Sequence, residues 1–508
     1  MMAESSPGNG VGQTYTPGSV DEVVALVRRA RQTGRPLFPV STGMNWGYRS
    51  ASPAQRGHDV ADLRLMNRIL NADSISERNP VAVIQPGVTQ RQLYDFLEAR
   101  APGLTFNVTG SAAGTSIMGN SLDRGVGYIG PRREDLFGLE VVTGAGNILR
   151  TGFRRLGEDS PLAHCHPYGL GPMLDGLFFQ GNFGIVTSAC FRLAVKHARR
   201  IAVTLSLRDS AQLPRFLDAL AGLKRQGVLS SVTHVGNRAR SRSTLAPGLA
   251  QQLSERHGYA GATLAAEVQM ALDLVAPTEW SAVGGVSGSA PHVEASVAEI
   301  RRALRGLARV NVITDRRLQL MSRVASKLAF LPPMRRLAAA LTAIRPLHGL
   351  ALGIPTDAAV SGLLWQAGQG EMPATGFDLS RCGLVYVCPA LPLNGALISE
   401  VISAMVRVAA GFQHELYATI NIETGTSAVA VTNILYDKVS AEETLRAQRC
   451  ADALYCCLRD FKLEVYRAGE AMMAGLGERD PAHWRQVRDL KASLDPDNII
   501  APGHYSLP

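Results

Sequence analysis

Three stretches in the first half of the chain are rich in glycine and hydroxyl side chains, and each adjoins an apolar run typical of a strand or helix. They lie at 41–48 (STGMNWGY), 115–128 (TSIMGNSLDRGVGY) and 180–187 (QGNFGIVT). Small residues allow a ligand to approach the backbone closely, where larger side chains would block it. Successive backbone N–H groups in such a loop form a nest that suits a pyrophosphate. The first loop alone is equally consistent with an ordinary turn, so all three together indicate a ligand site.

Helix and strand signals alternate around these loops. Ser19, with Glu22 three positions later, is a capping box that opens a helix, and Gly34 ends it. Thr89 and Gln92 open a second helix in the same way. Apolar runs predict strands at 36–40, 81–85, 139–142 and 185–193.

From about residue 198 the pattern changes. Apolar runs predict strands at 201–207 and 384–388. Helical spacing predicts helices at 210–226, 292–308, 316–343 and 395–411. This order favours an α+β unit in which helices cover an antiparallel sheet.

Motifs of several other enzyme classes are absent from the sequence. There is no GxGxxG after a strand, no Walker A loop, no HExxH and no GxSxG. His164, Cys165 and His166 suggest a metal site, but three adjacent residues cannot all face one ion. The seven cysteines form neither a disulfide framework nor a CxxC motif. With no secretory signal visible at the start, we expect a reduced, cytoplasmic protein without a metal.

The charge of the chain leaves a different class of function open. Lys and Arg number 52 against 43 Asp and Glu, and the net charge of +9 permits a nucleic-acid or acidic partner. The arginines are dispersed, often beside apolar helix positions, which is typical of solvated helix faces. No run of about 18 apolar residues occurs. We therefore expect neither a nucleic-acid partner nor a membrane span.

Taken in order, these loops and further segments resemble a known family. The chain is similar to the vanillyl-alcohol oxidase and p-cresol methylhydroxylase family of FAD-linked oxidoreductases. Residues 200–380 match only weakly. The matching segments are 41–48, 118–130 (MGNSLDRGVGYIG), 139–152, 168–187, 435–447, 464–467 (EVYR) and 494–503 (LDPDNIIAPG).

The resemblance implies an α+β fold with FAD as cofactor. A two-lobed FAD-binding domain would comprise residues 1–197 and 441–508. Residues 198–440 would form an inserted cap of antiparallel sheet and helices on the substrate side.

The resemblance also implies which residues bind FAD. The first loop would hold the pyrophosphate, and His504 would face the flavin ring. The residues that match the cofactor motifs are Ser41, Thr42, Gly43, Met44, Asn45, Trp46, Gly47, Pro86, Gly87, Ser111, Thr115, Ser116, Gly119, Asn120, Asp123, Gly125, Gly184, Ile185, Val186 and His504.

A phenolate clamp is implied as well. The family uses a tyrosine of the first loop and a Tyr-Arg pair near the C-terminus, and these motifs fall on Tyr48, Tyr466 and Arg467. Two phenol donors and a permanent positive charge lower the pKa of a bound phenol and hold it as phenolate. A hydride would then leave the carbon opposite for the flavin. The alternative is a buried tyrosine beside a surface arginine.

The chain departs from the family at the position of the covalent flavin link. The histidine that anchors the flavin in some members aligns with Leu384. We therefore expect non-covalent FAD, with Cys382 and Tyr386 as the residues able to contradict this.

The substrate pocket also differs from that of the family. The catalytic aspartate of the alkylphenol enzymes falls at Ser111, and a histidine pair falls at Val429 and Ala430. The implied function is oxidation of a small aromatic, phenolic substrate of 4-alkylphenol or benzylic-alcohol type. The alternative is oxidation of a non-phenolic alcohol, amine or biosynthetic intermediate bound through a carboxylate or enolate. The acceptor stays open between O2 and an electron-transfer protein, and the family habit implies a homodimer.

Overall fold

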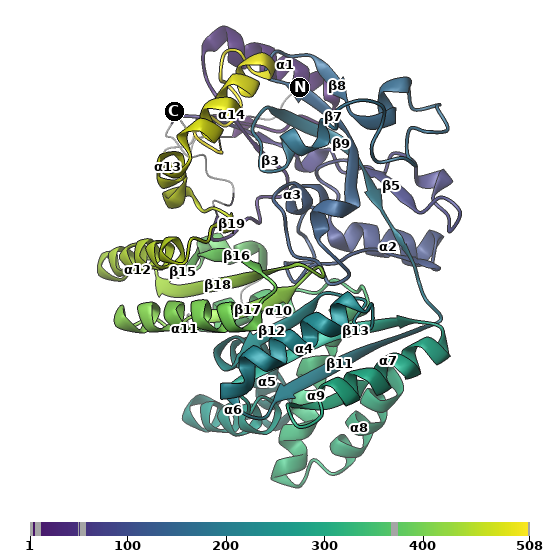
Figure 1. Ribbon diagram of the computed structural model, residues 1–508, viewed down its shortest axis with the longest axis vertical. Coiled ribbons are helices and arrows are strands. Elements are labelled where there is room, and N and C mark those ends of the chain that lie inside the picture. Colours follow the sequence, from purple (N-terminus) through teal and green to yellow (C-terminus); the bar gives the residue numbers. More distant parts are fainter. Residues whose placement is uncertain (1–3, 6–11, 49, 51–56, 367–373, 506–508) are drawn as a thin grey trace.

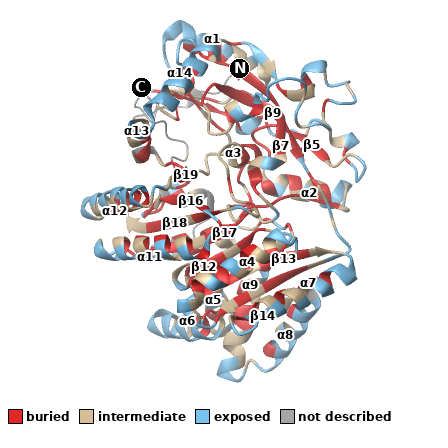
Figure 2. Ribbon diagram, in the orientation of Figure 1, coloured by how far each residue is buried: buried red, intermediate tan, exposed pale blue. Residues whose placement is uncertain are grey.

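The computed structural model describes residues 4–5, 12–48, 50, 57–366 and 374–505. In Figure 1 the N-terminal part of the chain and the C-terminal helices lie together, and the middle of the chain forms the rest of the molecule below them. Figure 2 shows that the strands are largely buried while the outer helix faces are exposed. The fold is therefore a mixture of sheets and covering helices, which confirms the expected α+β class.

Two four-stranded sheets form the N-terminal part. The first has the order β5-β9-β7-β8 with antiparallel neighbours, and all eight residues of β7 are buried. The second has the order β1-β2-β4-β3, in which β4 runs parallel to β2 and β3. A short pair, β6 and β10, lies apart. The strands are β1 (Glu4–Ser5), β2 (Thr14–Tyr15), β3 (Leu37–Val40), β4 (Asp59–Asp62), β5 (Val81–Ile84), β6 (Leu104–Thr105), β7 (Leu136–Thr143), β8 (Ile148–Arg150), β9 (Gly184–Arg192) and β10 (Ala194–Val195).

The helices of this part begin at the expected caps. In α1 (Val20–Thr33) the Ser19 side chain accepts from the Glu22 backbone N–H at 3.2 Å, and Gly34 ends the helix at φ 66°. In α2 (Gln90–Arg100) Thr89 accepts from Gln92 at 3.1 Å. A hydroxyl cap of this kind satisfies an N–H group that the first helical turn leaves unpaired. Both predicted helix starts are confirmed.

A nine-stranded antiparallel sheet dominates the middle of the chain. Its order is β14-β11-β13-β12-β17-β18-β16-β19, with β15 also paired to β18. The strands are β11 (Arg199–Leu207), β12 (Thr233–Asn237), β13 (Trp280–Gly288), β14 (Ala308–Ile313), β15 (Cys382–Tyr386), β16 (Cys388–Pro392), β17 (Tyr417–Ile422), β18 (Ser427–Asp437) and β19 (Val465–Arg467).

Helices pack against the two faces of this sheet. On one face α4, α7, α11 and α12 share a single apolar core with the strands. On the other, α5, α6 and α9 form a smaller core of their own, and α10 packs against α5. These helices are α4 (Leu213–Arg225), α5 (Arg238–His257), α6 (Gly261–Val275), α7 (Ala290–Ala303), α8 (Asp315–Lys327), α9 (Pro332–Ala351), α10 (Ala358–Gln366), α11 (Gly395–Gly411) and α12 (Ala441–Asp460).

The end of the chain returns to the N-terminal part. The helices α13 (Glu470–Arg479) and α14 (Pro481–Leu494) follow β19, and α14 lies close to α1 in Figure 1. The buried Lys491 ammonium pairs with Asp495 at 2.9 Å and donates to the carbonyls of Asn182 and Ile500. The Leu37 N–H donates to the Ile499 carbonyl at 2.7 Å. The first and last segments are therefore joined by hydrogen bonds as well as by packing.

Several expected boundaries are wrong. The single helix expected at 316–343 is two helices, because Pro332 and Pro333 cannot continue a helix and the preceding Leu331 is extended at ψ 125°. The helix expected at 292–308 ends at Ala303, and β14 follows. The strand expected at 384–388 is divided between β15 and β16.

Candidate active site

A cavity of about 760 Å³ lies between the N-terminal loops and the nine-stranded sheet. All of the residues assigned to the cofactor or the clamp from the sequence line it, except Gly47 and Gly87. Residues that are distant in sequence, such as Ser41, Thr115, Gly184, Tyr466 and His504, thus share one wall. The structure brings the three glycine-bearing loops to a single place.

The first loop needs its glycines for close packing. Gly43 and Gly47 have φ of 73° and 75°, in the left-handed region that favours glycine. A Cβ on Gly47 would lie 2.6 Å from the Tyr386 ring. Gly47 is therefore outside the cavity because it lets the loop pack directly on β15.

The second loop is bonded to the first. Ser116 donates its backbone N–H to the Thr42 hydroxyl at 3.0 Å and its own hydroxyl to the Pro86 carbonyl at 2.6 Å. Ser116 also caps the short helix α3 (Ile117–Leu122). A Cβ on Gly119 would lie 2.3 Å from the Ser41 hydroxyl oxygen, so a larger residue would displace the Ser41 side chain.

Two buried polar atoms of the second loop have no hydrogen-bond partner in the described part of the chain. They are the hydroxyl oxygen of Thr115 and the amide oxygen of Asn120. Buried polar atoms are normally paired, and unpaired ones in a cavity wall suit a polar ligand. Gly87 has a different function, because a Cβ there would meet the Arg64 carbonyl at 2.4 Å. The loops therefore fit a large polar cofactor, and Gly87 serves the turn that supports them.

The clamp residues contact one another in the cavity wall. The Tyr48 hydroxyl donates to the Cys388 sulfur at 3.3 Å, and the Tyr48 ring stacks on Tyr386 with centroids 4.8 Å apart. Tyr466 lines the same cavity and is an electrostatic neighbour of Tyr48. The guanidinium carbon of Arg467 lies 3.9 Å from the centre of the Tyr48 ring. Strand pairing explains the cluster, because Cys388 of β16 is in register with Arg467 of β19.

Burial sets the protonation states of these groups. It raises the pKa of Tyr48 and of Tyr466 well above the usual range, and that of Tyr386 to about 12. Burial also raises the pKa of Cys388 to about 11. At neutral pH these four groups are therefore uncharged, and the tyrosines have protons to donate.

Arg467 is buried and has a carboxylate partner. Its Nη2 forms an ion pair with Asp123 and donates to the amide oxygen of Asn45, while Nε has no partner in the described segments. Asn45 donates to Asp123 at 3.0 Å, which closes the group. Asp123, assigned to the cofactor from the sequence, thus contacts the clamp arginine directly.

The positions at which this chain lacks the aspartate and histidines of the family lie in several environments. Ser111 lines the cavity and is held by Thr109 at 2.6 Å and Gln90 at 3.2 Å. Ala430 belongs to the core on the opposite face of the long sheet. Leu384 is buried beside Trp46.

Sequence reasoning missed the sheet face that forms the other wall of the cavity. Thr204, His234, Thr419 and Asn421 line it, while the residues between them in the strands face the core. Because side chains alternate across a strand, polar residues at every second position could have revealed this face. His234 Nδ1 contacts the Asn421 amide oxygen at 2.7 Å, and burial lowers the pKa of His234 to about 4. Arg240, in the first turn of α5, was also missed.

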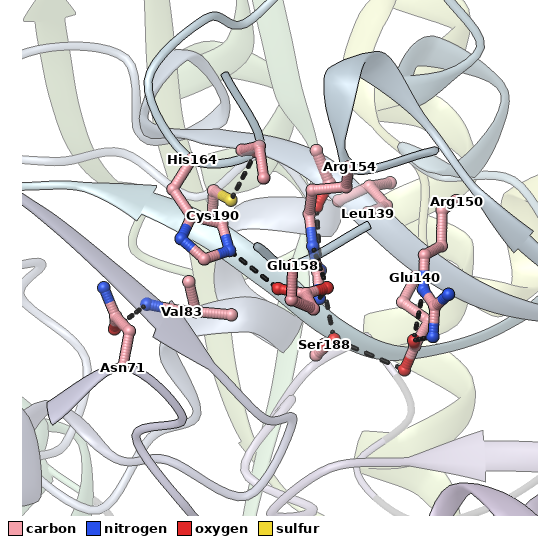
Figure 3. A network of polar contacts seen from close by, with 12 residues as sticks. Asn71, Val83, Leu139, Glu140, Arg150, Arg154, Glu158, His164, Ser188 and Cys190 are labelled. Atoms are coloured by element: carbon pink, nitrogen blue, oxygen red, sulfur yellow. Dashed lines mark hydrogen bonds and ion pairs between the residues drawn. The ribbon is translucent and has the colours of Figure 1, made fainter. Parts of the chain in front are cut away.

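A second polar network lies behind the site and supports β7 and β9 (Figure 3). The buried Arg154 donates to the Gly138 carbonyl at 3.0 Å, to the Ser188 hydroxyl at 3.1 Å and to Glu158. Glu158 also contacts His164 at 2.7 Å. In the described ranges no group of three His, Cys, Asp or Glu side chains is placed to hold a metal. His164 instead contacts Glu158 within this polar network.

The sequence of the chain is similar to that of known flavoproteins and of a decarboxylase. The sequence model of an FAD binding domain matches residues 13–152. The chain is 32% identical to the 1'-carboxy-chondrochloren decarboxylase of Chondromyces crocatus, over 96% of this chain and 89% of that one. It is 24% identical to the 4-cresol dehydrogenase (hydroxylating) flavoprotein subunit of Pseudomonas putida, over 100% of this chain and 90% of that one.

Two solved structures share the fold. One is p-cresol methylhydroxylase with substrate bound, with a TM-score of 0.78 and 23% identity over 98% of this chain and 89% of that one. The other is 4-ethylphenol oxidase from Gulosibacter chungangensis with isoeugenol, with a TM-score of 0.80 and 23% identity over 99% and 91%. Within the part of the chain that the structure describes, no helix combines the length and hydropathy needed to cross a membrane.

Proposed function

Because the chain belongs to the p-cresol methylhydroxylase family of FAD-linked oxidoreductases, we propose that it removes a hydride from a small phenolic substrate. Membership of the family makes the protein an FAD-dependent oxidoreductase. The substrate class rests on one observation. Tyr48 and Tyr466 are electrostatic neighbours in the cavity wall, and the Arg467 guanidinium lies against the Tyr48 ring.

Two neutral phenol groups and a cation suit an oxyanion of the substrate. Tyr48 and Tyr466 stay protonated at neutral pH because burial raises their pKa, so each can donate an O–H to the same oxygen. Donors to an oxyanion stabilise it and lower the pKa of a bound phenol. The resulting phenolate favours loss of a hydride from the carbon opposite. Arg467, stacked on Tyr48, orients that ring.

The loops described above fit FAD. The unpaired atoms of Thr115 and Asn120 and the close approach at Gly119 provide polar groups and room for the backbone to meet it. We expect 41–46, 115–125 and 184–186 to hold FAD, with His504 in the same wall. When bound, FAD supplies the two-electron acceptor for the hydride. Leu384 has no nucleophilic atom, so the proposed binding is non-covalent.

Anaerobic mixing with 4-ethylphenol tests the clamp. The wild-type protein should lose its flavin absorbance, and Tyr466→Phe should slow that loss about 100-fold, as removal of an oxyanion donor does elsewhere. Tyr455→Phe is the matched control, since Tyr455 lies on α12 and bonds to Glu464. If Tyr466→Phe bleaches at the wild-type rate, the clamp has no part in the reaction.

The mode of FAD binding has a separate test. After acid precipitation, the yellow colour should stay in the supernatant. Colour in the pellet would contradict non-covalent binding, and Tyr386, which lines the cavity, would be the first linkage residue to examine.

A second candidate is oxidative decarboxylation, favoured by the 32% identical relative named as a decarboxylase. The substrate would carry a carboxylate on the carbon next to the one that loses the hydride. The carbon–carbon bond to the carboxylate then breaks, its electron pair forms a C=C bond, and CO2 leaves. Release of CO2 in step with flavin reduction would identify this reaction. It also falls within the alternative reached from the sequence, a substrate bound through a carboxylate.

The proposal also includes a division of the chain into two domains. Residues 1–197 and 441–508 would form the FAD-binding domain and 198–440 the cap, supported by the long sheet built mainly from 199–437. The helix α12 packs on that sheet beside α11.

Hydrogen peroxide formed during turnover would identify O2 as acceptor, and its absence would favour an electron-transfer protein.

A further inference from the structure

Arg240 is a positively charged side chain in the cavity wall without an acidic partner. It lies in the first turn of α5, where the Asn237 side chain accepts its backbone N–H at 3.0 Å. Its guanidinium donates to the Asn433 amide oxygen and lies 5.9 Å from the Tyr417 ring centre. No carboxylate of the described residues pairs with it, whereas Asp123 balances Arg467 across the cavity.

The groups around Arg240 are neutral at physiological pH. The ionisable neighbours that influence it are Tyr386, Cys388 and Tyr417. Burial raises the pKa of Tyr386 to about 12 and that of Cys388 to about 11, and it also raises that of Tyr417. His234, another cavity residue, has a pKa lowered by burial to about 4. None of these groups supplies a negative charge, and a desolvated cation without one is unfavourable.

The guanidinium also keeps unused hydrogen-bond donors. Nε is buried without a partner, and no partner for Nη1 exists among the described residues. Nη2 carries two hydrogens and donates one of them to Asn433. Its other hydrogen lies on an edge shared with either Nε or Nη1, so one edge with two unused donors remains in either case. Such an edge matches the two oxygens of a carboxylate.

Arg240 also lies close to the phenol clamp. Its neighbours Tyr386 and Cys388 are the residues that contact Tyr48, one by ring stacking and the other by a hydrogen bond. Arg240 and the clamp residues line the same cavity, so an aromatic molecule held at the clamp can direct its side chain toward Arg240.

We propose that Arg240 binds a carboxylate on the side chain of the aromatic substrate, so that the substrate is a phenolic acid held at both ends. This inference rests on the proposed function, because it places the carboxylate on the molecule that is oxidised. It assigns the phenol end to Tyr48 and Tyr466 and the acid end to Arg240. The positive charge of Arg240, which no carboxylate of the described residues balances, selects acids over neutral alkylphenols of the same length.

The test compares 3-(4-hydroxyphenyl)propanoate with 4-propylphenol, which has a neutral side chain of similar length. Dissociation constants come from the change in flavin absorbance on binding to the holoenzyme, and rates come from anaerobic bleaching. The wild-type protein should bind the acid more tightly than the neutral phenol. Arg240→Gln should weaken binding of the acid about 10- to 100-fold, as expected for loss of a charge-assisted pair, and leave the neutral phenol unchanged.

Arg242→Gln is the matched control. Arg242 lies on the same helix two positions further on, and pairs with Asp273 at 2.8 Å and Gln269 at 2.8 Å outside the cavity wall. Its loss should change neither dissociation constant. Arg240→Lys, which keeps the charge but not the two-donor edge, should recover part of the acid binding.

Other outcomes would overturn the inference. No preference of the wild-type protein for the acid, or equal losses for acid and neutral phenol in Arg240→Gln, would remove Arg240 from substrate recognition. A lower FAD content in Arg240→Gln would assign the arginine to the cofactor instead. If either of the first two outcomes occurs while 4-propylphenol still bleaches the flavin, the carboxylate site fails and the proposed oxidation of phenols stays intact. Absence of bleaching and binding with both phenols would overturn the proposed function, and the inference with it.

Discussion

The guanidinium carbon of Arg467 lies over the Tyr48 ring, 3.9 Å from its centre, while Nη2 of the same side chain is paired with Asp123. Asp123 and Tyr48 come from the N-terminal loops, and Arg467 comes from β19. The cation therefore contacts both the aromatic ring and the carboxylate. Such a contact fixes the orientation of Tyr48 before any substrate binds.

Asp123→Asn should destabilise the protein by about 3 kcal/mol, because it leaves a buried guanidinium without its counter-ion. The two side chains are only 10% and 19% exposed, so solvent compensates little. Urea unfolding of the holoenzyme measures the loss. The double variant Asp123→Asn with Arg467→Met should recover part of the stability, and a loss in the double variant larger than in Asp123→Asn would show that the pair is not the cause.

The folded protein should lose stability in alkaline solution, because the clamp tyrosines ionise less readily in the folded than in the unfolded state. Burial raises the pKa of Tyr48 and Tyr466 in the folded state, whereas the unfolded chain titrates near about 10. The stability that comes from keeping them neutral is fully present below pH 10 and is lost as the pH rises above it. Thermal unfolding between pH 9 and 12 should show this decline. The decline should be shallower in Tyr48→Phe, and an unchanged slope would contradict the assignment.

Acid should weaken the network behind the site through Glu158. A hydrogen bond from His164, with Arg154 adding to it, lowers the pKa of Glu158 to about 2. Its contribution is present above the unfolded carboxyl pKa of about 4.3 and is lost as the pH falls toward 2. Glu158→Gln should therefore flatten the acid limb of a stability profile. Glu294→Gln, which removes the exposed partner of Arg199, should leave that limb unchanged.

Gly119→Ala should weaken FAD binding, because its Cβ would lie 2.3 Å from the Ser41 hydroxyl oxygen and displace that side chain in the cavity wall. Titration of the apoprotein with FAD, followed by flavin fluorescence, measures the affinity. Gly222→Ala is the control, since no atom lies within 4 Å of its Cβ position in α4. That substitution should leave FAD binding unchanged and raise stability by about 0.5 to 1 kcal/mol. Equal FAD affinity in both variants would mean that the contact at Gly119 does not shape the site.

Local signals predicted the elements that depend on neighbouring residues. The caps at Ser19 and Thr89 and the helix at 395–411 agree with the structure because each is decided within one or two turns. The strands β12 and β17 were missed. Their polar residues face the cavity, so the apolar pattern is incomplete until the sheet is assembled.

The site divides in the same way. The loops and the clamp were assigned from family motifs, each of which is a short segment, although Tyr48 lies far from Tyr466 and Arg467 in the sequence. Nothing local distinguishes Arg240 from Arg238 and Arg242, which flank it at two-residue spacing. Helix geometry decides which of the three arginines faces the cavity, because a step of two residues rotates the side chain by about 200° around the helix axis. Arg240 lines the cavity, whereas Arg238 pairs with Glu279 and Arg242 with Asp273.

The strand β19 is nearly the last element of the chain, yet it pairs with β16 and carries Tyr466 and Arg467 to the Tyr48 loop. During synthesis on the ribosome, the flavin loops and the long sheet are therefore made while the clamp is still missing. Contacts between such distant positions form slowly, because a long loop must close first. The proposed clamp, with His504 of the same wall, is thus among the last parts of the site to be synthesised, and a chain stopped before residue 465 would have the three N-terminal loops but neither Tyr466 nor Arg467.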